Sequence, residues 1–156
     1  MEIKELENKI KELQEEIERL KNKENKRWRA KMEESYFYID EALIVRKTVD
    51  CQPFDSYRYN YHNYFKTKEE TQAGADNIKT HIELIELAEE LNTEPIDWNN
   101  GNQNKYLIAL GKNDILQDVT FYAKTANTIY CTNSYFKNEA IKRIGEERLI
   151  KYLKGI

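Results

Sequence analysis

The residue types best suited to binding lie in one short segment, residues 57–66. Four of the chain's eleven tyrosines fall within residues 57–64. Protein interfaces favour tyrosine because it offers a large contact area at low rotamer cost and a hydroxyl for a polar partner. Basic groups interleave with the rings, which also suits stacking on bases beside phosphates. The candidate binding residues are therefore Tyr57, Arg58, Tyr59, Tyr61, His62 and Lys66.

The same tyrosines have a purely structural alternative. Tyr57, Tyr59 and Tyr61 alternate along the chain, so a strand would place all three on one face. In that case they would contribute to packing rather than to a binding surface. Phe65, which follows them, is expected in the core beneath the next helix.

Residues that could carry catalysis are few. His62 could act as an acid or base with Asp55 or a tyrosine, although proximity in the sequence is the only support. His81 is expected at the surface or core edge of a helix. Cys51 and Cys131 form no CxxC pair and have no neighbouring His, so we expect small buried hydrophobic side chains rather than metal ligands or a disulfide framework. We expect no catalytic residue, no metal site, no cofactor and no enzyme.

Composition narrows the class of protein. The chain has 156 residues, of which 34 % are charged, and a net charge of −3, which indicates neither a nucleic-acid-coating protein nor an acidic tail. No run approaches the roughly 18 apolar residues of a membrane-spanning helix. The N-terminus is charged from Glu2 onward and lacks the apolar region of a signal peptide. A cytoplasmic protein with no membrane partner is expected.

A narrow apolar repeat runs through the N-terminal segment. Its residues are spaced alternately three and four apart, with Ile at each a position and Leu at each d position of a heptad. This pattern favours a parallel two-stranded coiled coil, so we expect residues 1–27 to form a homodimer. The alternative is one amphipathic helix folded back on residues 28–156. The seam consists of Ile3, Leu6, Ile10, Leu13, Ile17 and Leu20.

Basic residues follow the seam. They could contact phosphates while Trp28 stacks on a base. The alternative is a solvated helix end, where cations suit the helix dipole, with Trp28 anchoring the helix on the next domain. This basic collar comprises Arg19, Lys21, Lys23, Lys26, Arg27, Arg29 and Lys31.

Residues 28–156 have the pattern of an α+β domain. Strands are predicted at 36–39, 43–49, 105–110, 119–123 and 128–131 from aromatic and β-branched runs. Thr67 and Glu70 form a capping-box pattern that opens a helix to about Leu91. Two further helices are predicted, from about residue 133 to Gly145 and over 146–153. Because strands and helices segregate, we expect a small antiparallel sheet packed with one long and two shorter helices.

Several short motifs extend over nearly the whole chain. They are the heptad segment, Arg27-Trp28-Arg29-Ala30, Tyr36-Phe37-Tyr38-Ile39-Asp40, the stretch from Tyr59 to Glu70, Ile96-Asp97-Trp98 and Ile144-Gly145-Glu146-Glu147-Arg148-Leu149. In these motifs the chain resembles small accessory proteins encoded by phages and prophages of low-GC Gram-positive bacteria. The stretch from Tyr59 contains Asn63-Tyr64-Phe65-Lys66-Thr67-Lys68-Glu69-Glu70.

The resemblance implies a role in the host cytoplasm. Small accessory proteins of this type often act against host defences, including CRISPR nucleases and nucleotide signalling. Members usually have Gly where this chain has His62, and Ala where it has Thr71. Gly readily adopts a positive φ, and His does so only rarely. The resemblance therefore leaves open whether the backbone at His62 has a positive φ.

Two hypotheses of function follow. In the first, a coiled-coil dimer binds and inhibits a host defence factor by protein–protein contact, through its Tyr-rich face or its acidic helix surface. In the second, the basic collar with Arg58, Tyr59 and Tyr61 binds nucleic acid or a signalling nucleotide. The overall negative charge favours the first hypothesis.

Overall fold

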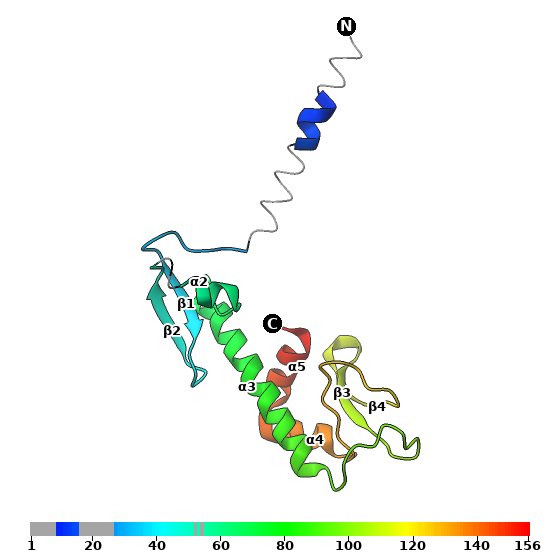
Figure 1. Cartoon of the computed structure of the whole chain (residues 1–156). Coiled ribbons are helices and arrows are strands. Elements are labelled where there is room, and N and C mark those ends of the chain that lie inside the picture. Colours follow the sequence, from blue (N-terminus) through cyan, green and yellow to red (C-terminus); the bar gives the residue numbers. More distant parts are fainter. Residues whose placement is uncertain (1–8, 16–26, 52, 54) are drawn as a thin grey trace.

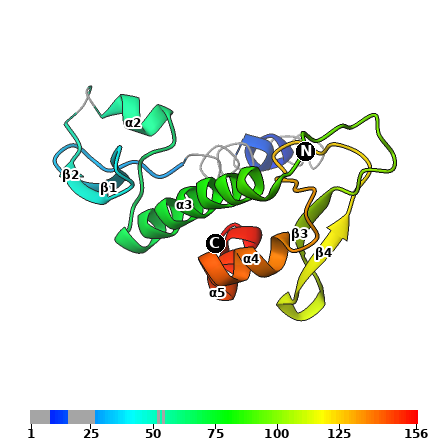
Figure 2. The same cartoon turned by 90° about the horizontal axis from the view of Figure 1, so that it is seen from below.

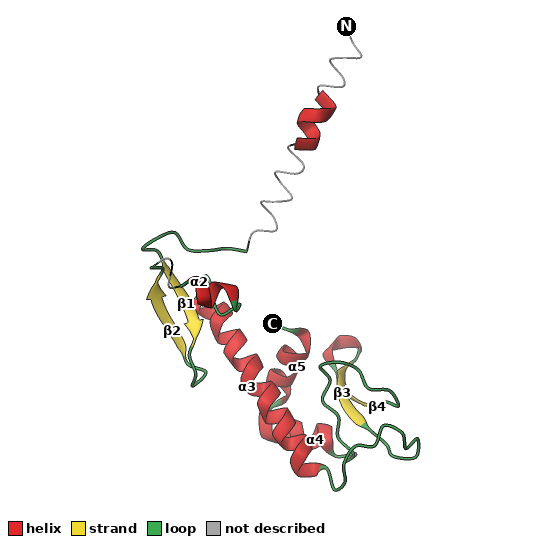
Figure 3. Cartoon of the chain, in the orientation of Figure 1, coloured by secondary structure: helices red, strands yellow, loops and turns green. Residues whose placement is uncertain are grey.

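A 24-residue helix, α3 (Lys68–Leu91), connects the two halves of the described fold. A computed structural model of the chain describes residues 9–15, 27–51, 53 and 55–156. Strands β1 and β2 and helix α2 lie at the N-terminal end of α3, and α4, α5, β3 and β4 lie along its C-terminal half (Figures 1 and 2). Helices and strands are thus both present, as Figure 3 shows, and the α+β class is confirmed.

The start of α3 is fixed by the predicted capping box. The Thr67 side chain accepts a hydrogen bond from the Glu70 amide at 3.1 Å, and the Glu70 carboxylate accepts one from the Thr67 amide at 3.3 Å. The Thr71 hydroxyl donates to the Thr67 carbonyl at 2.7 Å. A cap of this kind typically stabilises a helix by about 0.5–2 kcal/mol.

The apolar face of α3 is not the one that the isoleucine spacing suggests. Ile78, Ile82 and Ile85 remain 43 %, 44 % and 37 % exposed. A second stripe is buried instead, because α4, α5 and the first hairpin all pack on that side. Helical periodicity identifies both stripes and does not reveal which one has neighbours. The buried residues are Thr71, Ala75, Thr80, Leu84, Leu87 and Ala88.

The first hairpin agrees with the prediction. Strands β1 (Ser35–Ile39) and β2 (Val45–Val49) pair antiparallel, with Ile39 opposite Val45. Asp40 organises the turn, since its carboxylate accepts hydrogen bonds from the Ala42 and Ile44 amides at 3.0 and 2.9 Å. These side-chain bonds add to two backbone hydrogen bonds of 3.0 Å, from the Leu43 amide to the Asp40 carbonyl and from the Asp40 amide to the Ile44 carbonyl.

The second half of the sheet prediction is wrong. Strand β3 (Tyr106–Leu110) is where it was predicted, but its partner β4 (Leu116–Thr120) begins three residues before the predicted strand at 119–123. Residues 128–131 contribute only a single bridge, between Cys131 and Tyr106. The two hairpins form separate two-stranded sheets. The first packs on α3, whereas the second packs on α4 and α5.

The two C-terminal helices are confirmed. Helix α4 (Phe136–Ile144) and helix α5 (Glu146–Lys154) are separated by Gly145, whose φ of 94° few other residues would tolerate. Both helices pack on α3 and β3 and enclose the larger hydrophobic core. This core includes Leu84, Leu87, Ile108, Leu116, Cys131, Phe136, Ala140 and Leu149.

The heptad segment is described only in part. Residues 9–15 are helical, and Ile10 and Leu13 are 55 % and 57 % exposed. The other seam residues, Ile3, Leu6, Ile17 and Leu20, lie outside the described residues. Within the described ranges, no helix combines the length and apolar character needed to cross a membrane.

Candidate functional site

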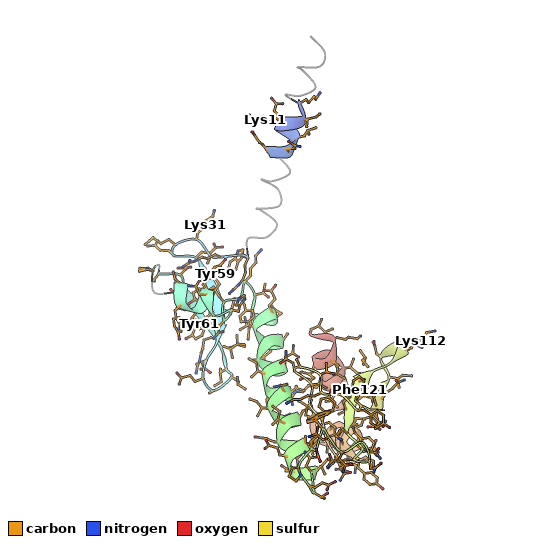
Figure 4. The ribbon with its side chains drawn as sticks, turned by 45° about the vertical axis from the view of Figure 1, so that its right-hand side comes forward. Lys11, Lys31, Tyr59, Tyr61, Lys112 and Phe121 are labelled. Atoms are coloured by element: carbon orange, nitrogen blue, oxygen red, sulfur yellow. The ribbon has the colours of Figure 1, made fainter. Side chains whose placement is uncertain are left out.

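The Tyr-rich segment forms a short helix, α2 (Ser56–Asn60), and not a strand. The strand interpretation of these tyrosines is therefore wrong. On a helix, residues four apart share a face whereas residues two apart do not. Tyr57 and Tyr61 are both 68 % exposed, with ring centroids 4.4 Å apart. Figure 4 labels Tyr59 and Tyr61 in this part of the molecule.

Tyr59 is half-buried and packs against the buried residues Tyr36 and Tyr64. Its ring packs edge-on against Tyr64 with 5.6 Å between centroids, and its hydroxyl donates to the Arg27 carbonyl at 2.9 Å. In return, the Arg27 guanidinium donates to the Tyr59 carbonyl at 2.5 Å and lies 4.5 Å from its ring centroid. The Arg29 guanidinium lies 5.0 Å from the same centroid. Tyr59 is thus part of the scaffold beneath the exposed tyrosines.

A stacked tyrosine pair forms the centre of this scaffold. The rings of Tyr36 and Tyr64 are parallel within 11°, with 3.8 Å between centroids, and both residues are buried. The Tyr36 hydroxyl donates to Asp55, and the Tyr64 hydroxyl donates to Asp50 at 2.6 Å. The Tyr64 oxygen also accepts from the Ala30 amide at 3.2 Å. Both tyrosine hydroxyls are thereby hydrogen-bonded inside an aromatic core.

Trp28 joins the same cluster. Its ring lies 5.7 Å from that of Tyr64, and it packs against the buried residues Ala30, Tyr36 and Tyr64. This agrees with the alternative in which Trp28 anchors the N-terminal segment on the domain. Residues 27–30 belong to neither a helix nor a strand.

Burial and the contacts between the tyrosine hydroxyls and the aspartate carboxylates shift pKa values within the cluster. Burial, followed by the hydrogen bond to Asp55, raises the pKa of Tyr36 to about 12. Burial and the contact with Asp50 likewise raise the pKa of Tyr64. Burial by itself opposes ionisation of Asp55, but hydrogen bonds from Cys51, Tyr36 and Arg58 outweigh it and lower the pKa of that carboxyl. Neutral tyrosines beside an ionised Asp55 are therefore the stable state.

The Asp50 carboxylate has an incomplete set of hydrogen bonds within the described residues. It is fully buried, and one carboxylate oxygen accepts from Tyr64 and from the Arg29 guanidinium at 3.4 Å. Its other oxygen has no hydrogen-bond partner among the described residues. Arg29 also donates to the Ser56 hydroxyl at 3.0 Å, so it links β2 to the start of α2.

The exposed side of the cluster carries the candidate site, which we call the aromatic face and define as Tyr38, Tyr57, Arg58 and Tyr61. The Arg58 guanidinium lies 3.9 Å from the Tyr38 ring centroid and donates to Asp55 at 3.1 Å and to the Tyr36 hydroxyl at 3.0 Å. Beside it is an open hollow of about 760 Å³. The hollow is lined by Tyr38, Ile39, Asp40, Glu41, Ala42, Asp55, Tyr57, Arg58 and Asn63.

His62 and Lys66 are exposed at the edges of this region. His62 has a φ of 61°, so its backbone has the left-handed conformation that Gly adopts most readily. Its ring makes no hydrogen bond with any residue that the structure describes, so no acid–base pair with Asp55 is supported there. Lys66 follows Phe65, which pairs with Phe37 through backbone hydrogen bonds at 2.9 and 3.0 Å.

The two cysteines and His81 are not part of the aromatic face. Cys131 is buried as predicted, but Cys51 is exposed, so the expectation of two buried thiols is wrong for Cys51. His81 lies at the core edge as expected, and its ring is 2.7 Å from the Tyr152 hydroxyl. Among residues 9–15, 27–51, 53 and 55–156, no three His, Cys, Asp or Glu side chains gather in a manner suited to a metal ion.

Sequence reasoning missed the roles of Tyr36, Asp50 and Asp55. Their contacts join residues 14 and 19 positions apart, across a hairpin and a loop. Periodicity does not report such contacts. The only local signal is the spacing of Asp55 and Arg58, which suits an ion pair within one helical turn.

Comparisons with known proteins add no identity. No protein-family model matches the chain. Neither the curated proteins nor the solved structures gave a significant match.

Proposed function

We propose that the chain is a non-enzymatic phage or prophage accessory protein that binds and inhibits a host defence factor, such as a CRISPR–Cas component, through the aromatic face. The observation that carries the proposal is the exposure of Tyr57 and Tyr61, each 68 %. Tyr57 lies in α2 and Tyr61 is its C-cap residue, and their rings are neighbours, with 4.4 Å between centroids. Tyrosine and arginine are the residue types that dominate binding energy at protein interfaces.

The rigidity of the support favours this use. Arg58 is held by Asp55, Tyr36 and Tyr38, and so it projects beside the two tyrosines in one fixed arrangement. A surface already ordered before binding loses less conformational entropy when its partner arrives. The aromatic face therefore suits a specific partner.

The charges around the hollow favour a protein over a nucleotide. Asp40, Glu41 and Asp55 line it, and Arg58 is already paired with Asp55. Two described arginines of the basic collar, Arg27 and Arg29, point into the cluster and contact Tyr59. A phosphate would have to compete with these carboxylates and displace these contacts.

The proposal includes a coiled-coil dimer. The helical conformation of residues 9–15 and the exposure of Ile10 and Leu13 support it, because an apolar seam gains free energy only when a partner covers it. Parallel pairing would join two aromatic faces in one assembly. Binding to a dimeric or repetitive target would then be strengthened by bivalency.

The test compares two double variants by affinity capture from a lysate of a low-GC Gram-positive host. Tyr57→Ser with Tyr61→Ser alters the aromatic face, and Tyr122→Ser with Tyr135→Ser alters tyrosines of similar exposure, 68 % and 65 %, at the other end of α3. Loss of one hot-spot tyrosine weakens binding by about 2 kcal/mol or more, which is about 30-fold. Only the first variant should lose the captured protein.

A second measurement distinguishes the nucleotide alternative. Purified protein that carries bound nucleotide would have a raised ratio of absorbance at 260 nm to that at 280 nm, and perchloric acid would release the nucleotide. The proposal predicts the ratio expected for two Trp and eleven Tyr alone. A raised ratio that the tyrosine variant abolishes would overturn it.

A further inference from the structure

A pocket of about 330 Å³ opens into the larger hydrophobic core, in the half of the molecule that lacks the aromatic face. Side chains from α3, β3, α4 and α5 form its walls, and the segment after β4 forms its mouth. The walls include the buried residues Leu84, Ile108, Phe136 and Leu149. Phe121, labelled in Figure 4, also lines the pocket and is 41 % exposed.

The size of this pocket suits a small ligand. It is open to solvent at its mouth, so it is a surface pocket that reaches the core and not a sealed void. One water takes about 30 Å³ of liquid volume, so the pocket has room for about ten groups of that size. Water is a poor occupant, because apolar walls offer it few hydrogen-bond partners and such cavities bind apolar molecules instead.

The lining defines the chemistry of the occupant. Most of the walls are aliphatic and aromatic, and the hydroxyl of the lining residue Tyr152 is already paired with the His81 ring at 2.7 Å. The polar side chains Thr125, Asn127 and Thr128 lie in the segment at the mouth. No Asp, Glu, Lys, Arg or His is among the residues that line the pocket. An ionised head group would therefore have no counter-charge there, whereas a neutral hydroxyl or amide could hydrogen-bond with the mouth.

From these observations we propose that the pocket binds a neutral amphiphile, with an apolar body of about ten heavy atoms and one uncharged hydrogen-bonding end. The body would lie against Leu84, Phe136 and Leu149, and the polar end would reach Thr125, Asn127 or Thr128. The size and lining resemble those of small-molecule sites in general, which are concave, mostly apolar and fitted with few polar groups. This site is separate from the aromatic face and does not depend on the proposed function.

The test uses 1-octanol as the probe and the full-length chain. Isothermal titration calorimetry should show saturable binding with a negative heat-capacity change. Saturating octanol should raise the melting temperature, because it binds the folded state. Octanoate, which has the same chain and a charged end, should bind at least about tenfold more weakly, since its carboxylate would be desolvated without a partner.

A variant whose pocket is filled by a larger side chain tests the site, and a matched variant changes a residue outside the pocket. Leu107→Phe places a larger ring on a lining position, whereas Ile115→Phe makes the same kind of change at a residue that is 58 % exposed and outside the lining. Octanol binding should fall at least about tenfold in Leu107→Phe and persist in Ile115→Phe. If Leu107→Phe does not fold, Leu153→Phe fills the pocket from α5.

Three results would overturn the proposal. They are the absence of saturable octanol binding to the wild type, equal binding to the filled variant and to Ile115→Phe, and octanoate binding as tight as that of octanol. The first two would remove the site itself. The third would show that the pocket does not prefer an uncharged head group over a charged one.

Discussion

The rings of Tyr36 and Tyr64 lie face to face, 3.8 Å between centroids, yet their hydroxyls donate to two different carboxylates, Asp55 and Asp50. Each carboxylate is in turn paired with an arginine, Arg58 or Arg29. The stacked pair thus ties β1 and the segment before α3 to the end of β2 and the start of α2. This arrangement fixes the orientation of α2 and hence of the aromatic face.

Removal of the Tyr64 hydroxyl should destabilise the fold. Tyr64→Phe keeps the stacked ring but removes the 2.6 Å hydrogen bond to Asp50. The other oxygen of this carboxylate has no hydrogen-bond partner in the part of the chain that the structure describes. A buried carboxylate left with fewer donors costs about 1–3 kcal/mol. Urea unfolding should show this loss for Tyr64→Phe. The same change at the exposed Tyr61 should stay within about 0.5 kcal/mol.

Stability should fall at alkaline pH. Folding raises the pKa of Tyr36 from 10.0 to about 12, so the folded state holds this proton more tightly than the unfolded state. The resulting stabilisation is complete below pH 10.0 and is lost as the pH rises through about 12. Free energies of unfolding measured over this range should fall more steeply for the wild type than for Tyr36→Phe. Equal slopes would show that Tyr36 does not titrate abnormally.

Tyrosines two residues apart should behave differently. Tyr59 packs against Tyr64 and exchanges hydrogen bonds with Arg27, whereas Tyr61 is 68 % exposed. Tyr59→Ser should therefore cost about 3 kcal/mol, as truncation of a packed aromatic ring does. Tyr61→Ser should leave the melting temperature nearly unchanged. Similar melting temperatures for the two variants would contradict the helical placement of this segment.

Local patterns predicted the elements whose determinants are local. The capping box at Thr67 and Glu70, the hairpin around Asp40 and the break at Gly145 depend on residues within a few positions of one another. The placement of the tyrosines was not predictable in the same way. Alternation of Tyr57, Tyr59 and Tyr61 suited a strand, but the contacts of Tyr59 with Arg27 and Tyr64 select a helix.

Local patterns also did not predict which of two apolar surfaces is buried. Helix α3 has two apolar stripes, and the packing of α4 and α5 leaves Ile78, Ile82 and Ile85 exposed. Likewise, residues 128–131 have strand-forming side chains but contribute only one bridge among the described residues, between Cys131 and Tyr106 on the edge of β3 that β4 leaves free. In both cases distant segments decide the outcome. For the candidate site, composition pointed to the segment but not to which of its side chains face outward.

The N-terminal seam should produce a dimer. Six large apolar side chains on a narrow stripe would each gain about 1.5–3 kcal/mol from full burial between chains. Light scattering on the intact protein should give about twice the chain mass of 18.7 kDa. Ile10→Asp with Leu13→Asp should give a folded monomer, since both side chains are exposed in the single chain. An intact protein that stays monomeric at high concentration would favour a helix docked on its own domain.

Site-specific photocrosslinking tests the proposed contact most directly. A benzophenone amino acid at position 61 probes the aromatic face, and the same group at position 122 is the control, because Tyr61 and Tyr122 are equally exposed at 68 %. Irradiation in host lysate should yield a discrete protein adduct from position 61 that is absent from position 122. An adduct with nucleic acid alone, or the same protein adducts from both positions, would contradict a protein-binding aromatic face.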